Sequence, residues 1–363
     1  MRKATIGIVI VVVSALGLHQ FFNAEIFADN PPAKSTGQII LMGLNISSAA
    51  EGAADDQSTG LTEDVTARET SAKEGDIEKR PNRFSFRALN PHDNVLRTIT
   101  EFPGHAWIGR ISPDGQQIVF NMPAHSVSFA DDGDGWINTR GWDIWTMNVD
   151  GTNKRIIIKG AGAGRVTCWS PDGTKFIYYR EDHPNAQLKR YRNFVFDIKS
   201  EQATRLEFPE NESVWDWSPD GKELLTVTEF QEEPGRQMFR VNFDGSNRVR
   251  LGRPNRTNLW PRFSPEGQRV AFLSYNRHGG NICVVNRDGS RLFEVNHDDL
   301  LRPGAPVWSS DGQQLATLCN SRTPGPDNES SHDVFTLNAN GSNVRRITST
   351  PITQDSAMGL DWK

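Results

Sequence analysis

Two groups of side chains in this sequence are suited to chemistry, and the first is an aspartate run, Asp131-Asp132-Gly133-Asp134-Gly135. Asp132 and Asp134 fit the third and fifth positions of an EF-hand-type calcium loop, where carboxylate oxygens bind a hard cation. Ala130 and Gly141 stand where such a loop has its first and last carboxylates. The run therefore leaves two hypotheses: a calcium ion bound by Asp131, Asp132 and Asp134, or a plain acidic loop.

The second group is a set of histidines. Of the eight histidines, most fall in segments between apolar strands, which the repeat described below places on one face. Neutral imidazoles that converge there could bind a transition metal. The alternative is that long connections collect polar residues without binding any ligand. The histidine candidates for this binding face are His125, His183, His278, His297 and His332.

Aromatic and basic residues near the same strands extend this candidate face. Trp215 and Trp260 lie upstream of the aromatic position that recurs before each turn, so they are candidates for stacking on a ligand. The recurring tryptophans themselves are expected in the core. Arg110, Arg165 and Arg262 flank the innermost strands and could attract anions to a central channel, with solvated surface arginine as the alternative.

Most catalytic motifs are absent from the sequence. It contains no Gly-x-Ser-x-Gly elbow, no His-Glu-x-x-His and no Cys-x-x-Cys, so we do not expect an enzyme built on those motifs. The 40 basic and 45 acidic residues give a net charge of −5, and no basic field indicates nucleic acid. The three cysteines are too few for a disulfide framework and are expected as buried thiols.

A short turn motif recurs five times and dominates the chain. Trp217-Ser218-Pro219-Asp220-Gly221 is repeated, with small changes, so that the motif ends at glycines 115, 173, 221, 267 and 312. A repeat of this length indicates a propeller or a solenoid. Ser, a Pro with fixed φ and a final Gly suit a tight reversal between two strands, and a short apolar run follows each copy.

A second signature follows in most of these units. Trp142 to Gly151 is an apolar strand that ends in an Asp-Gly turn, and another apolar strand begins near Ile156. Such a dipeptide between apolar runs is a strong hairpin signal. Each unit therefore predicts four antiparallel strands, which is one blade of a propeller.

The two signatures together resemble the WD-like repeat of the TolB-type β-propellers, over 84–363. That resemblance implies a propeller that docks envelope proteins. The oligogalacturonate lyases have a similar repeat pattern, and this second likeness implies a metal at a histidine cluster.

The ends of the chain predict how the propeller closes. Phe84 to Asn90 and Val95 to Ile99 match the third and fourth strands of a blade, and Met358 to Trp362 matches a first strand. Gly37 to Met42 could supply the second strand. The sequence therefore predicts a six-bladed β-propeller of four-stranded antiparallel blades, closed by N- and C-terminal strands in one blade, which would remove exposed sheet edges.

The N-terminal region differs in composition from the repeats. Arg2-Lys3 followed by an apolar run over 4–18 is typical of a signal peptide, so 1–28 is expected to be a signal peptide or an N-terminal membrane anchor. The polar segment 29–83 is expected to be largely disordered, with one propeller strand at 37–44.

The sequence as a whole predicts an exported, non-catalytic scaffold, periplasmic or secreted, that binds an envelope or extracellular protein as a monomer. We expect no nucleic-acid partner, no cofactor other than the calcium of the first hypothesis, and membrane contact only through an uncleaved segment 4–18. One alternative is a metal-dependent polysaccharide lyase, of the oligogalacturonate type, that uses the histidine face. The other is a calcium-dependent adhesion or structural module centred on Asp132 and Asp134.

Overall fold

The computed structural model describes parts of one compact unit, Lys34–Lys363. The described residues are 39–44, 83–91, 93–103, 107–123, 142–160, 164–182, 190–229, 235–276, 279–322, 331–348, 352–353 and 359–362. Within these ranges no helix is long and apolar enough to cross a membrane. The predicted signal peptide or anchor, 1–28, and most of the polar segment lie outside the described residues.

Consecutive strands form the blades. The first blade contains β4 (Trp107–Ile111), β5 (Gln117–Pro123), β6 (Trp142–Asn148) and β7 (Arg155–Ile158). The second contains β8 (Arg165–Trp169), β9 (Lys175–Asp182), β10 (Arg190–Asp197) and β11 (Gln202–Leu206). The third contains β12 (Glu212–Trp217), β13 (Glu223–Glu229), β14 (Arg236–Asn242) and β15 (Val249–Leu251). Every strand pair in these blades is antiparallel.

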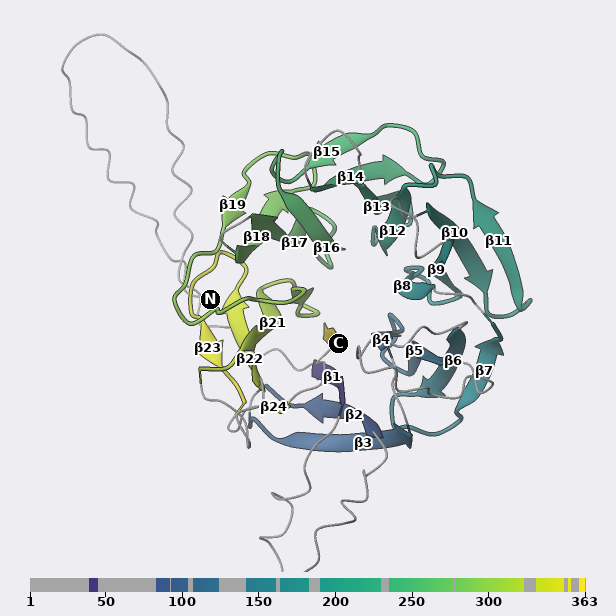
Figure 1. Cartoon of the computed structure of the whole chain (residues 1–363), viewed down its shortest axis with the longest axis horizontal. Coiled ribbons are helices and arrows are strands. Elements are labelled where there is room, and N and C mark those ends of the chain that lie inside the picture. The colour runs from purple at the N-terminus through teal and green to yellow at the C-terminus, as the bar shows by residue number, and fades with distance from the viewer. Residues whose placement is uncertain are drawn as a thin grey trace, which may run out of the picture. The chain divides into compact units, whose positions relative to one another are not determined.

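Two further blades continue the series around a common axis (Figure 1). The fourth contains β16 (Thr257–Phe263), β17 (Arg269–Asn276), β18 (Gly279–Asn286) and β19 (Phe293–Glu294). The fifth contains β20 (Val307–Trp308), β21 (Gln314–Asn320), β22 (Ser331–Asn338) and β23 (Arg345–Arg346), with β24 (Ile352–Thr353) paired to β22. The first strand of each blade lies nearest the axis and the last lies at the rim.

The remaining strands make a sheet of different origin, here called the terminal sheet. It contains β25 (Gly359–Trp362), β1 (Ile39–Leu44), β2 (Arg83–Leu89) and β3 (Leu96–Pro103), in that order. β1 is antiparallel to both β2 and β25, with Ile39 opposite Leu89 on one side and Trp362 on the other.

The predicted six-bladed ring of four-stranded blades is wrong. The described residues contain five blades made of consecutive strands, and the fifth of these has five strands because β24 joins it. The terminal sheet is assembled from separate parts of the chain and is not a sixth repeat of that kind. The prediction failed because only five complete copies of the turn motif exist, and the sixth unit was extrapolated from remnants that lack the turn.

The repeated turns connect the first and second strands of the five blades by one set of hydrogen bonds. In each turn the Gly amide donates to the Ser carbonyl at 2.7 to 2.9 Å, and the Gly has φ between 69° and 75°. Each Ser Oγ accepts from the amide five residues later at 2.8 or 2.9 Å. A left-handed residue is unfavourable for any side chain with a Cβ, which explains why Gly ends every copy.

The core lies between neighbouring sheets. The position just before the turn Ser is apolar in every blade, and it is 7% exposed in Trp169 and 6% in Trp308. Its equivalent in β25, Trp362, is 2% exposed. Two of these indoles also donate a hydrogen bond to the inner strand of the preceding blade. Trp169 Nε1 donates to the Arg110 carbonyl at 2.9 Å, and Trp308 Nε1 donates to the Arg262 carbonyl at 3.0 Å. The recurring aromatic position therefore joins adjacent blades by packing and by hydrogen bonds.

The inner strands are not regular. Pairing skips one or more residues between Trp107 and Arg110, Val166 and Cys168, Val214 and Asp216, and Leu259 and Arg262. Such β-bulges bend a strand and turn its side chains in a new direction. At the axis they determine which side chains of the inner strands meet.

Candidate functional site

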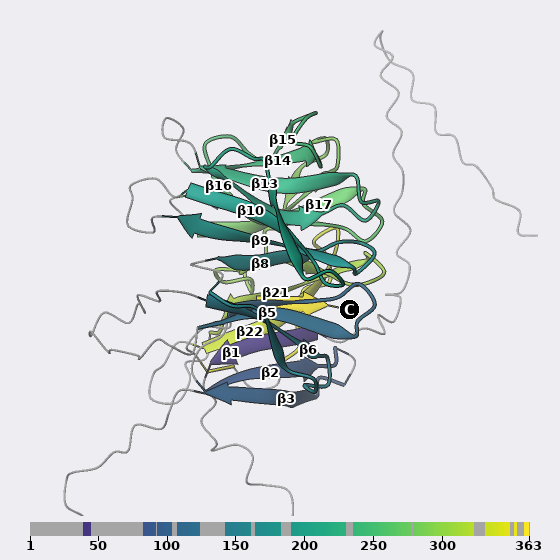
Figure 2. The ribbon, with the colours of Figure 1, turned by 90° about the vertical axis from the view of Figure 1, so that its right-hand side faces the viewer.

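A cavity of about 290 Å³ lies on the axis, at the end of the inner strands where the repeated turns begin. Its rim includes prolines of the turns, Pro113, Pro171, Pro219 and Pro265. The turns and the long connections after the second strands occupy opposite ends of the strands, which run across the view of Figure 2. We call the two ends the turn face and the loop face; the cavity opens at the turn face.

The residues around the cavity come from one position in the inner strands, two residues before the turn Ser or its equivalent, here called the axial position. In sequence order the residues at this position are Arg110, Cys168, Asp216, Arg262, Val307 and Asp361. Four of the six are charged, although inner-strand positions are mostly buried. A charged residue is seldom buried without a partner, so this position is unlike the rest of the strand.

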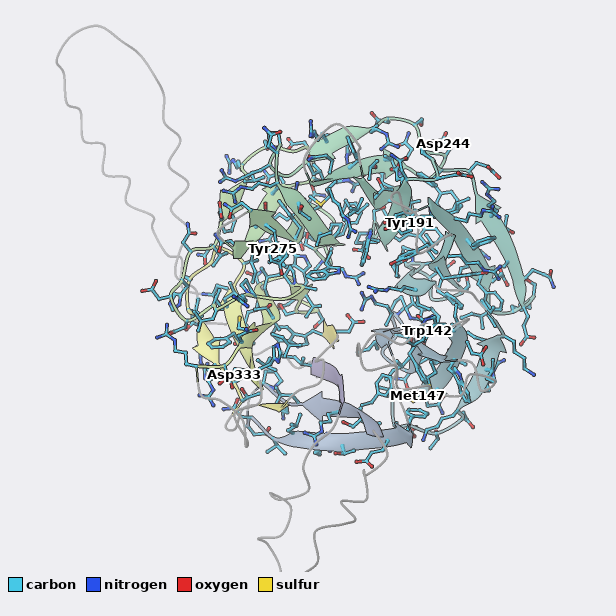
Figure 3. The ribbon with its side chains drawn as sticks, in the orientation of Figure 1. Trp142, Met147, Tyr191, Asp244, Tyr275 and Asp333 are labelled. Carbon is cyan, nitrogen blue, oxygen red and sulfur yellow. The ribbon has the colours of Figure 1, made fainter. Side chains whose placement is uncertain are left out.

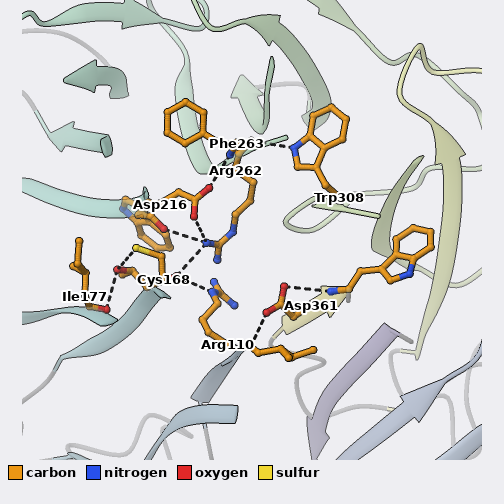
Figure 4. A network of polar contacts seen from close by, with 12 residues as sticks. Arg110, Cys168, Ile177, Asp216, Arg262, Phe263, Trp308 and Asp361 are labelled. Carbon is orange, nitrogen blue, oxygen red and sulfur yellow. Dashed lines mark hydrogen bonds and ion pairs between the residues drawn. The ribbon is translucent and has the colours of Figure 1, made fainter. Parts of the chain in front are cut away.

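Both axial aspartates accept a hydrogen bond from the inner strand of the next sheet. Asp216 Oδ2 accepts from the Phe263 amide at 2.7 Å, and Asp361 Oδ2 accepts from the Ile111 amide at 2.8 Å. In both cases the donor is the residue that follows an axial arginine. The two aspartates thus hold the backbone directly after Arg262 and Arg110 in place (Figure 4).

The two axial arginines converge on one carbonyl oxygen. Arg110 Nε donates to the Thr167 carbonyl at 2.8 Å, and Arg262 Nη1 donates to the same oxygen at 3.1 Å. Arg262 Nη1 also lies 3.3 Å from Asp216 Oδ1. Two guanidinium groups of like charge are therefore held side by side at the base of the cavity.

Burial shifts the ionisation of these groups. Desolvation, and then the like charge of Arg262, lowers the pKa of Arg110 to about 9. Desolvation raises the pKa of Asp216, against the opposing effect of Arg262. Desolvation also raises the pKa of the Cys168 thiol to about 12, so this cysteine remains protonated at neutral pH and is a poor nucleophile.

Comparison with known proteins agrees with this architecture. No family model matches the chain. An uncharacterized protein of Agrobacterium fabrum is 29% identical over 160 residues, which are 41% of this chain and 52% of that protein. A TolB homologue of Chlorobium luteolum is 29% identical over 116 residues, which are 32% of this chain and 24% of that protein. The chain thus spans about half the length of the first relative and about a quarter of the second.

The fold is also that of a solved TolB structure. The crystal structure of TolB from Acinetobacter baumannii superposes with a TM-score of 0.62 at 13% identity, over 91% of this chain and 67% of that one. The chain thus has the β-propeller fold of TolB and a repeat similar to that of TolB homologues. The resemblance inferred from the turn motif is confirmed.

Of the predicted binding residues, the TolB-like propeller brings Arg110 and Arg262 together at the axial cavity. Arg165 begins β8, at the loop-face end of its inner strand. Trp215 is 6% exposed and packs in an aromatic cluster with Tyr179 and Tyr191, the latter labelled in Figure 3. The structure thus separates the predicted arginines into two locations.

Trp260 has an unusual backbone. Its φ is 53°, in the left-handed region that bulky residues rarely adopt, and it lies in the bulge of β16. Its half-buried side chain packs against the Trp215 cluster and also against the core between the fourth and fifth blades. The bulge therefore lets Trp260 contact two clusters, which compensates for the backbone strain.

The two described histidines of the predicted set lie in different surroundings. His297 is largely exposed, accepts a hydrogen bond at Nδ1 from the Asp299 amide at 3.2 Å, and follows the fourth blade. His332 is in β22 beside Asp333, which is labelled in Figure 3, and burial lowers the pKa of its imidazole. No group of three or more His, Cys, Asp or Glu side chains is placed to hold a metal ion in the ranges that the structure describes.

Six predicted ligands lie outside the described residues: His125, His183, His278, Asp131, Asp132 and Asp134. The calcium hypothesis and the histidine site therefore stay predictions. The axial aspartates and Cys168 were not proposed from the sequence. Aligning the repeats on the turn Ser and comparing the residue two places before it would have found them, because only that inner-strand position has charges of both signs.

Proposed function

We propose that this chain is an exported, non-catalytic propeller that docks an envelope or extracellular protein. The observation that carries the proposal is its likeness to TolB in both repeat sequence and fold. The sequence adds an N-terminal segment of secretory type and lacks the catalytic motifs sought above. A ring of packed blades is also a rigid support for connections that contact a partner.

Export is tested by fusing residues 1–83 to a reporter enzyme that folds only outside the cytoplasm. We expect reporter activity and its loss when Val11→Asp and Val12→Asp together interrupt the apolar run, because two charges there abolish a signal or an anchor. Conservative changes of the same valines to leucine are the matched control and should retain activity. An inactive native fusion that is nevertheless expressed would contradict export.

Docking is tested by site-specific photo-crosslinking in cells. A crosslinking residue at the exposed Gln313 reports on the turn face, one at the exposed Arg322 on the loop face, and one at Thr204 in the rim strand β11 serves as the control. We expect a crosslink to one envelope or extracellular protein from one face and none from the rim. Crosslinks absent from both faces, or found equally at the rim, would contradict a scaffold role.

The polysaccharide lyase and the calcium-dependent module are separate hypotheses, because the three aspartates and three of the five candidate histidines lie outside the described ranges. Metal content distinguishes them from the scaffold, as set out in the Discussion.

A further inference from the structure

The axial cavity has more hydrogen-bond donors than acceptors. An arginine side chain carries five N–H donors on three nitrogens. Arg110 uses Nε and Nη1, the latter toward the Gly109 carbonyl at 2.9 Å, and Arg262 uses Nη1 alone. Among the described residues, Arg110 Nη2 and Arg262 Nε and Nη2 therefore have no protein acceptor.

The carboxylates of the cavity are already occupied. Asp216 accepts at Oδ1 from Arg262 and at Oδ2 from the Phe263 amide. Asp361 accepts at Oδ1 from the Trp362 amide at 3.2 Å and at Oδ2 from the Ile111 amide. Each of the four carboxylate oxygens therefore already has a donor from the protein. A molecule that entered the cavity would therefore be held through its own oxygen atoms.

The net charge of the axial cavity and the side chains that line it limit the kind of ligand that fits. Two arginines and two aspartates have no net formal charge, so a singly charged acceptor suits the cavity better than a doubly charged phosphate ester. Above the arginines the lining is apolar, with Trp217, Phe263 and Trp308 beside the turn prolines. These walls would pack against a short carbon chain.

We propose that the axial cavity binds a small organic monocarboxylate, with its carboxylate against Arg110 and Arg262 and its carbon chain toward the turn face. Planar guanidinium groups match the geometry of a carboxylate and can donate two parallel hydrogen bonds to it. The site is preorganised, because backbone contacts to Asp216 and Asp361 fix the strands that carry both arginines. This site is independent of the docking proposed above, since it requires no partner protein.

The test is calorimetric titration of the purified chain with butyrate, and with butyramide as the neutral analogue of the same shape. We expect butyrate to bind with one-to-one stoichiometry and butyramide to bind at least tenfold more weakly. Arg262→Gln should weaken butyrate binding at least tenfold. Arg155→Gln, which changes an exposed arginine of the outer strand β7, is the matched control and should leave binding unchanged.

The native protein provides a second measurement that needs no substitution at the arginines. Butyrate should raise the melting temperature of the native protein in proportion to its occupancy of the cavity, whereas butyramide at the same concentration should not. If Arg262→Gln does not fold, this comparison decides. Equal effects of the two compounds, no binding of butyrate, or full binding by folded Arg262→Gln would overturn the proposal.

Discussion

Two positions in each inner strand, only two residues apart, behave in opposite ways across the repeats. The turn position is serine in all five blades, as Ser112, Ser170, Ser218, Ser264 and Ser309, and it is buried and hydrogen-bonded in the same way each time. The axial position holds four residue types in the six inner strands, with Arg and Asp twice each, and so includes both signs of charge. The repeated serine thus forms the turn of every blade, whereas the axial residue, which varies, determines which contacts form at the axis.

The two positions differ because the turn serine makes contacts within its own turn, whereas the axial residue makes contacts with another sheet. A turn serine bonds within its own turn, so each blade needs the same residue whatever its neighbours are. An axial residue bonds to a different sheet, as Asp216 does to Phe263 and Asp361 does to Ile111. Its best identity therefore depends on what stands next to it around the axis.

The largest effect is expected beside the axial Asp361, where the core residue Trp362 is 2% exposed and packs with Val307 and Ile39. Trp362→Ala should lower the free energy of unfolding by about 3 to 5 kcal/mol, because it removes a buried aromatic side chain and leaves a cavity. Urea denaturation measures this. Val95→Ala, at a residue 48% exposed, is the control and should stay within about 0.5 kcal/mol. A loss for Trp362→Ala as small as that of the control would show that the terminal sheet adds no stability.

A smaller and uniform effect is expected at the turn position. Ser218→Ala removes a buried hydroxyl that donates to Asp220 and accepts from the Glu223 amide, and it should cost about 1 to 3 kcal/mol. The same substitution at Ser170, which makes the corresponding bonds, should cost the same within error. Urea denaturation of both variants checks this, and clearly unequal values would break the equivalence of the turns.

Acid should have opposite effects on stability at Asp172, an aspartate of a turn, and at Asp216, an aspartate of the axis. Hydrogen bonds from Ser170, and then from Thr174, lower the pKa of Asp172 below the ordinary value, so its contribution to stability is present above that value and disappears as the pH falls through the lowered pKa. Burial raises the pKa of Asp216, so its protonation favours the folded state, and that contribution is lost as the pH rises through the raised pKa.

Carboxyl NMR titration checks these directions directly, with Asp172→Asn and Asp216→Asn to assign the two signals. The Asp172 signal should titrate below pH 3.9, about the ordinary value, and the Asp216 signal above it. If both carboxyl groups titrated on the same side of that value, the pKa values of Asp172 and Asp216 would not be shifted in opposite directions as described.

The smallest effect on stability is expected from metal removal. This experiment tests the candidate ligands of the loop face, since the axial site requires no metal. We expect protein purified without chelator to carry no stoichiometric metal and to melt at the same temperature with and without chelator. Elemental analysis of native protein, Asp134→Ala and His183→Ala checks this. Calcium lost with Asp134 would support the calcium loop, and a transition metal lost with His183 would support the lyase.

Much of the fold was predictable because its signals are local. Ser, Pro, Asp and Gly in one short motif encode a turn, and the apolar runs after Gly173 and Gly221 encode buried strands such as β9 and β13. The TolB-like likeness followed from the same residues. The pairing of β25 with β1 agrees with the predicted combination of N- and C-terminal strands in one sheet. The blade count was wrong because the sixth unit was extrapolated from segments that lack the turn motif.

The site was predicted only in part, for a related reason. Arg110 and Arg262 were singled out as charges near the channel, but their convergence on the Thr167 carbonyl depends on the bulges in the inner strands. A bulge shifts the alternation of side chains by one residue, so regular strand periodicity assigns the wrong neighbours. Asp216 and Asp361 were overlooked because each acts on the backbone of another sheet.

The pairing of β1 with β25 has a consequence for biosynthesis. A ribosome makes β1 near the start of the chain and β25 only after all five blades, so β1 must wait for its second neighbour while the rest is translated. During that interval one edge of β1 has unpaired peptide groups, which invite mispairing with other chains. The pairing of β25 with β1 is therefore expected to be the slowest step of folding. Chaperones that bind an exposed strand edge should have their largest effect before this pairing forms.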